Sequence, residues 1–204
     1  MKSVLGAVLM LTISSNAEAQ VNPDSVKWRN DCRLASQIVT HGQPANRREW
    51  AIRVLPDCGA EGGRAVAAAL NLHRSGGGKA EELEELVMIT SVLHDANVFR
   101  AALSIAVDPA AQERARVQAF RILYFQLTRG AVDPYESFLA ASGTIHFRIT
   151  DYPFTEGQPL PPTAARQVLD AARTVRGDTN NRANVRAAAG RARARACRVL
   201  ANVC

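Results

Sequence analysis

The alanines of this chain, by their number and position, constrain its fold more than any other feature. Alanine fills 35 of the 204 positions, whereas only 5% of the residues are aromatic. The alanines concentrate in four stretches, at 65–69, 101–106, 110–119 and 187–196. Because alanine has the highest helix propensity and strands favour β-branched and aromatic residues, this pattern predicts closely packed helices rather than a sheet. A chain of this length can bury one hydrophobic core.

Short amphipathic helices separated by short turns are expected along the chain. Trp28, Cys32, Ala35 and Val39 recur at helical spacing and predict a first helix. Asp108–Pro109 reads as an N-cap followed by proline at the first helical position. Connections this short make neighbouring helices pack antiparallel. The other expected helices lie at 50–55, at 64–73 after a flexible stretch at 59–63, at 81–93, 96–107 and 109–127, and within 163–204.

The N-terminal segment has the three regions of a secretory signal peptide in the correct order. Lys2 supplies a positive start, 4–13 is apolar, and Ala17–Ala19 forms a small-x-small cleavage site. The apolar run is too short to span a bilayer, for which about 20 residues are needed. A buried N-terminal helix is the alternative interpretation. We expect cleavage after Ala19 and a secreted or periplasmic protein without a transmembrane segment.

Four cysteines follow this segment, and export makes disulfides their expected state. Cys32 lies in one predicted helix and Cys58 just past the next, and the turn between these helices puts the two cysteines at similar heights, so they are a plausible pair. Cys197 and Cys204 are seven residues apart and can pair only if the helix breaks near Ala201. Since no C-x-x-C motif occurs, we expect no metal site and no cofactor.

A weak internal repeat accompanies the helices. Similar triplets occur at 53–55, 91–93, 121–123 and 198–200, and the first three are 38 and 30 residues apart. Periods of about 30–40 residues are typical of stacked helical hairpins, in which each pair of helices buries its face on the next.

Three segments also resemble a known repeat family. Asp108–Pro109 leading into 116–119 looks like the second helix of a HEAT repeat, and Val185–Ala189 is similar to its V-R-x-A-A pattern. The run from Ala51 to Leu55, continuing into Gly59 and the stretch from Ala65 to Leu70, is similar to the junction between two repeats. This resemblance to the HEAT and armadillo type implies an all-α solenoid. It also implies a scaffold or binding surface, because members of the family mostly act in that way.

Residues 141–162 interrupt the helical pattern. Polar and apolar residues alternate over 144–150, as in a half-buried strand, and a proline-rich loop follows. Long loops in compact domains are often functional or disordered. We consider a cover over a helix face, a recognition loop or a disordered segment. The candidate binding residues of this insertion are His146, Phe147, Tyr152 and Phe154.

The basic charge is concentrated at the C-terminus. Residues 163–204 carry nine arginines and two acidic residues. Arg182, Arg186 and Arg193 line one flank of an apolar stripe formed by Val185, Ala189, Ala192, Ala196, Val199 and Val203. A solvated final helix, a polyanion-binding patch, or pairing with the acids at 81–85 would each explain these arginines. Nucleic acid is not expected, because aromatic residues are not interleaved with the arginines.

Catalytic motifs are not evident. The four histidines are scattered, and His94–Asp95 reads as a helix cap with a dipole partner. Gly76–Lys79 looks like a phosphate loop, but Ala80 stands where a magnesium-binding hydroxyl is needed. We therefore predict a non-enzymatic protein-interaction or scaffold module with an unknown protein partner. An enzyme or small-ligand binder with a pocket under 141–162, and an anion-binding final helix, are the alternatives.

Overall fold

The structure is a computed structural model that describes residues 23–41, 47, 50–51, 54–77, 79–128 and 155–201. The described part is mostly helical, as the alanine pattern predicts. The elements are α1 Pro23–His41, the 3-10 turn η2 Leu55–Cys58, α3 Gly59–Arg74, α4 Ala80–Val92, β1 Leu93–His94, α5 Ala96–Val107, α6 Glu113–Gln126, β2 Thr155–Glu156, α8 Ala164–Gly177 and α9 Ala183–Val199.

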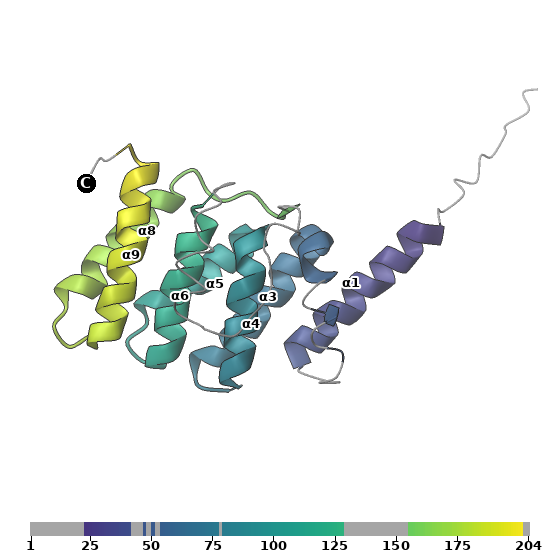
Figure 1. The fold of residues 1–204 in the computed structure, drawn as a ribbon, viewed down its shortest axis with the longest axis horizontal. Coiled ribbons are helices and arrows are strands. Elements are labelled where there is room, and N and C mark those ends of the chain that lie inside the picture. The colour runs from purple at the N-terminus through teal and green to yellow at the C-terminus, as the bar shows by residue number, and fades with distance from the viewer. Residues whose placement is uncertain are drawn as a thin grey trace, which may run out of the picture.

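The helices are arranged in two layers. In one layer α3, α5 and α8 lie side by side, and in the other α4, α6 and α9 do so (Figure 1). Helix α1 packs against α3. The helix pairs α3–α4, α5–α6 and α8–α9 are each joined by a short turn, and the three turns lie along the same edge of the molecule (Figure 1). We call this the turn edge.

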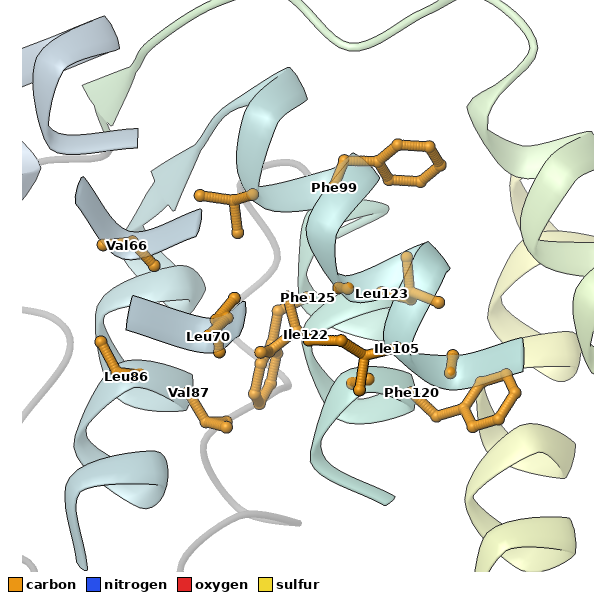
Figure 2. Close-up of a cluster of buried hydrophobic side chains, with 14 of the residues drawn as sticks. Val66, Leu70, Leu86, Val87, Phe99, Ile105, Phe120, Ile122, Leu123 and Phe125 are labelled. Carbon is orange, nitrogen blue, oxygen red and sulfur yellow. The ribbon is translucent and has the colours of Figure 1, made fainter. Parts of the chain in front are cut away.

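The hydrophobic core runs between the two layers. Alanines of the four predicted stretches are buried there, among them Ala69, Ala102, Ala119 and Ala189. Their small side chains let the helices approach, and larger side chains fill the remaining space. Figure 2 labels several of these larger side chains, namely Val66, Leu70, Leu86, Val87, Phe99, Ile105, Phe120, Ile122, Leu123 and Phe125.

The stretch at 59–63 is helical, so the prediction that it is flexible was wrong. Helix α3 begins at Gly59, and Gly62 and Gly63 are buried within its first two turns. A Cβ atom on Gly62 would overlap the carbonyl oxygen of Leu55, and one on Gly63 would overlap the carboxyl group of Asp95. These glycines therefore permit close packing rather than flexibility.

Asp108 does not cap the helix that follows it, so this part of the sequence interpretation was wrong too. Helix α6 begins only at Glu113, and Asp108 stands at the C-terminal end of α5. Its Oδ1 accepts a hydrogen bond from the backbone N–H of Ala110 at 2.9 Å. This local bond forms a reverse turn, which two antiparallel helices need before the second can start.

The predicted disulfide between Cys32 and Cys58 is present, with the Cα atoms 5.5 Å apart. It ties α1 to the turn in front of α3. Cys197 is also disulfide-bonded, whereas Cys204 lies outside the described residues. The helix break near Ala201 that a Cys197–Cys204 pair requires is present, because α9 ends at Val199 and Ala201 has a φ of 53°.

The apolar stripe of the final helix is confirmed over most of its length. Val185, Ala189, Ala192 and Ala196 are buried, but Val199 is 50% exposed, and Val203 lies outside the described residues. The exposure of Val199 follows from helix length. Arg195 donates to the carbonyl oxygen of Leu127 just past the end of α6, so the last turn of α9 projects beyond its neighbour.

Candidate functional site

Two turns of the turn edge have the same structure. Asp108 accepts from the N–H of Ala110 and Asp178 from the N–H of Asn180, both at 2.9 Å. The carbonyl oxygens of the two aspartates each accept from the N–H three residues further on, both at 3.2 Å. The segments starting at Asp108 and Asp178 are therefore equivalent, and they place the first turns of α6 and α9 side by side.

Polar contacts join each turn to the next. Arg74 at the end of α3 donates to Asp108 Oδ2 at 2.6 Å, and its carbonyl oxygen accepts from the N–H of Gln112 at 3.1 Å. In the same way, Glu113 accepts from Arg182 at 2.9 Å and from Asn184 at 3.2 Å. The three helix pairs are thus connected in order along this edge.

A cleft of about 690 Å³ opens between the second and third pairs at this edge. We call it the turn cleft. The ligand pockets of proteins span about 300–1,000 Å³, so its size suits a small molecule or a short peptide segment. The residues that line it are Pro109, Ala111, Gln112, Glu113, Arg114, Arg116, Val117, Asn180, Asn181, Arg182, Asn184 and Val185.

The lining of the turn cleft is basic. It carries three guanidinium groups and one carboxylate, a formal charge of +2. The carboxylate, Glu113, is already bound to Arg182 and Asn184. Helices α6 and α9 also begin at the cleft, and the backbone N–H groups and the helix dipole at the start of a helix favour anions.

A second polar cluster lies on the face formed by α4 and α6. Glu84 accepts hydrogen bonds from Gln118 and from Arg121, the latter at 3.1 Å. Burial lowers the pKa of Arg121, as does the positive charge of Arg191 on α9, and the charge of Glu84 acts in the opposite direction. The guanidinium stays charged under all ordinary conditions. This cluster holds α4 against α6.

A third cluster surrounds the fully buried Asp95, the N-cap of α5. Its carboxylate accepts from the backbone N–H groups of Asn97 at 2.7 Å and Gln158 at 2.6 Å. Its own N–H donates to Gln126, whose side-chain amide donates to the carbonyl oxygens of Thr90 and Leu93. The prediction of a cap at this position is confirmed, and the cap also fixes the chain that returns after the insertion.

That returning chain forms a short parallel pairing, with Leu93 opposite Thr155 and His94 opposite Glu156. Residues 155–162 are the described part of the predicted insertion. The predicted strand at 144–150 and the candidate binding residues of the insertion lie outside the described residues. These candidates are His146, Phe147, Tyr152 and Phe154.

The three candidate arginines of the final helix have different surroundings. Arg182 is 78% exposed and lies at the rim of the turn cleft. Arg186 donates to the carbonyl oxygens of Thr179 and Asn181, within its own turn. Arg193 is half-buried, and its Nε has no hydrogen-bond partner in the described part of the chain. The structure therefore brings only Arg182 into the cleft.

The sequence interpretation missed most of the cleft residues. Arg114, Arg116, Asn180 and Asn184 come from two segments about 70 residues apart and meet only in the folded chain. One signal could have linked them. Aligning the chain on Asp108 and Asp178 makes the two segments equivalent: Arg114 and Asn184 both follow the aspartate by six residues, and Arg116 and Arg186 both follow it by eight.

Searches of protein-family models, of curated proteins and of solved structures find no match to this chain. Among the described residues, none of the helices combines the length and apolarity needed to cross a bilayer. The described part of the chain also holds no group of three or more His, Cys, Asp or Glu side chains placed to bind a metal ion.

Proposed function

We propose that this chain is an exported, HEAT-like α-solenoid that acts as a non-enzymatic protein-interaction module. The observation that carries this proposal is the turn cleft, which two successive helix pairs form jointly at an exposed edge. A stack of repeats presents such surfaces because each pair contacts only its neighbours and leaves the turns open to partners.

The repeat character is supported by the equivalence of the two turns. Asp108 and Asp178 make the same two local hydrogen bonds, and the pairs they belong to pack on each other through α6 and α9. An ion pair also crosses each junction, between Arg74 and Asp108 and between Glu113 and Arg182. Recurring turns with recurring junctions are what a solenoid built from similar units requires.

Export is supported by the disulfide and by the N-terminal sequence. The Cys32–Cys58 bond is the kind of structural disulfide that persists in oxidising compartments. The segment at 1–19 has the order of regions of a cleavable signal. Together they indicate the periplasm or the extracellular space.

Binding rather than catalysis is supported by the chemistry of the cleft. Its lining side chains carry no hydroxyl, thiol or imidazole group, so they supply none of the usual nucleophiles. Glu113 is the one carboxylate that could act as a base, and it is engaged by Arg182 and Asn184. Amides and guanidinium groups remain, and these bind polar surfaces.

Site-directed photo-crosslinking in the cells that make the protein tests this proposal. A photoreactive residue would replace Asn184 in the cleft or, as the matched control, Gln167. Gln167 is also an exposed amide, but it lies in the first turn of α8, at the end of that helix away from the turn edge. We expect an adduct with one partner protein from position 184 and not from position 167.

The adduct must then be reproduced with the purified partner. Equal labelling from both positions, or the absence of an adduct at position 184, would contradict the proposed interaction surface.

A further inference from the structure

Arg116 is a buried cation whose hydrogen-bonding capacity is mostly unused. It is only 7% exposed, and it lies in the lining of the turn cleft. Its Nε donates to the carbonyl oxygen of Ala106 at 3.2 Å. Its two terminal amino groups donate to no described residue. Buried charges in proteins are normally paired, because leaving a buried guanidinium without a counter-charge is costly.

The carboxylate of Asp108 does not supply this counter-charge in full. Asp108 is close enough for Arg116 to help hold the pKa of its carboxyl group below the ordinary value, though the N–H of Ala110 and Arg74 contribute more. Both oxygens of Asp108 are also occupied, one by Ala110 and the other by Arg74. The amino groups of Arg116, a residue that lines the cleft, donate to no described residue and remain available to a ligand.

Two further arginines flank Arg116 within the cleft. Arg114 donates to the carbonyl oxygen of Ala80 at 3.2 Å, and Arg182 binds Glu113. Each uses only part of its five N–H donors in these contacts. A guanidinium fork matches the two oxygens of a carboxylate, and the resulting paired hydrogen bonds are among the strongest in proteins.

We propose that the turn cleft is a carboxylate-binding site, which binds the acidic side chains of a peptide segment of the partner protein. Arg116 forms its floor, and Arg114 and Arg182 form its sides. This inference rests on the proposed interaction function and names the chemistry of the partner. The acidic segment would supply the counter-charge that Arg116 lacks.

The mixed character of the lining favours an acidic peptide over a dense polyanion. Asn180 and Asn184 offer amides that suit a peptide backbone, and Val117 and Val185 offer apolar surface for side-chain stems. Glu113 would repel a chain of closely spaced sulfates or phosphates. An acidic peptide with neutral residues between its carboxylates avoids this repulsion.

Fluorescence anisotropy with a defined probe tests the inference. The probe is a labelled, end-capped peptide of alternating glutamate and glycine, and the matched control replaces every glutamate by glutamine. Heparin and inorganic phosphate are the competitors. We expect the glutamate peptide to bind and the glutamine peptide not to bind. Arg116→Gln should weaken binding roughly 10- to 100-fold, the range expected for losing a charge-assisted hydrogen-bond pair.

Two variants separate binding from folding. Arg114→Gln combined with Arg182→Gln removes charge at exposed positions, and this double variant decides the outcome if Arg116→Gln does not fold. Arg166→Gln makes the same charge change on an exposed side chain in the first turn of α8, away from the turn edge, and should leave binding unchanged.

Equal losses in the cleft variants and in Arg166→Gln would overturn the inference, since binding would then follow net charge. Binding of heparin or phosphate without binding of the peptide would also overturn it. If the peptide fails to bind while the crosslink at position 184 persists, the carboxylate site is wrong and the interaction function stands. If both fail, the interaction function fails as well.

Discussion

Replacing the buried Asp95 by alanine should destabilise the fold more than any comparable change in an exposed turn. The carboxylate accepts two backbone hydrogen bonds, from Asn97 at the start of α5 and from Gln158 in the returning chain. Asp95→Ala removes the acceptor of both. It leaves two N–H groups without a partner in a site where Asp95 itself is 0% exposed.

The magnitude follows from these two losses. Loss of an N-cap costs about 0.5–2 kcal/mol, and a buried donor left unsatisfied costs about 1–3 kcal/mol. Together they predict a loss of about 2–4 kcal/mol in the free energy of unfolding. For a chain of this size each kcal/mol lowers the melting temperature by about 2–4 °C. We therefore expect a decrease of about 5–15 °C.

Asp178→Ala is the matched control, because Asp178 also accepts a hydrogen bond from the backbone N–H two residues further on, but at an exposed position. Asp178 accepts from the N–H of Asn180 at 2.9 Å, and Asp95 accepts in the same way from the N–H of Asn97 at 2.7 Å. Unlike Asp95, Asp178 is exposed. Water can replace the lost acceptor there, so the cost should stay below about 1 kcal/mol.

Thermal and urea unfolding followed by circular dichroism at 222 nm measures both variants against the parent protein. The transitions must be cooperative and the urea m-values equal, so that the midpoints report stability. A midpoint shift for Asp95→Ala that is no larger than that for Asp178→Ala would refute the reasoning. It would show that Gln158 and Asn97 find other partners when the carboxylate is absent.

Three further predictions use the same unfolding assays. Gly63→Ala should destabilise the fold by about 1–3 kcal/mol, because the added Cβ would overlap the Asp95 carboxyl group. Gly177→Ala is the control: open space surrounds this position, so the change should be neutral or stabilise the fold by up to about 1 kcal/mol. Equal shifts of the unfolding midpoint in the two variants would contradict this prediction. Replacing both Cys32 and Cys58 by alanine should lower the free energy of unfolding by about 3.5 kcal/mol, which is the loop-closure value for a sequence separation of 26. An unchanged unfolding midpoint would argue against the bond. Asp108→Asn should destabilise the protein at pH 7, because the folded state lowers the pKa of the Asp108 carboxyl group below its ordinary value of 3.8. The difference from the parent should shrink as the pH falls below 3.8 and vanish once the pH is below the folded-state pKa. A pH-independent difference would exclude this origin.

The elements that local sequence determines could be predicted. Cys32, Ala35 and Val39 recur at helical spacing and are buried in α1, and most alanines of the four stretches are buried as well. The Cys32–Cys58 disulfide followed from the expected export of the chain together with helix geometry. Such features depend on residues within a few turns of one another, so a single sequence contains the information.

Features that depend on distant neighbours could not be predicted in this way. Gly63 reads as flexible in isolation, and only the position of Asp95 shows that the site has no room for a side chain. Val199 fits the apolar stripe of α9, but its burial depends on the length of α6. Arg182 stands among nine C-terminal arginines, and its pairing with Glu113 spans 69 residues. These contacts exist only after the helix pairs stack.

The two equivalent arginines of the chain give the strongest internal argument for where a ligand binds. Arg116 and Arg186 occupy the same position after Asp108 and Asp178, and both hydrogen-bond backbone carbonyl oxygens near their turns. The terminal nitrogen Nη1 of Arg186 is engaged by Thr179 and Asn181, whereas the terminal nitrogens of Arg116 donate to no described residue. Arg186 belongs to the last described pair, and Arg116 faces the cleft between two pairs. The two arginines thus have different roles at equivalent positions. Arg186, in the last described pair, stabilises its own turn, whereas Arg116, between two pairs, remains available for an acidic partner.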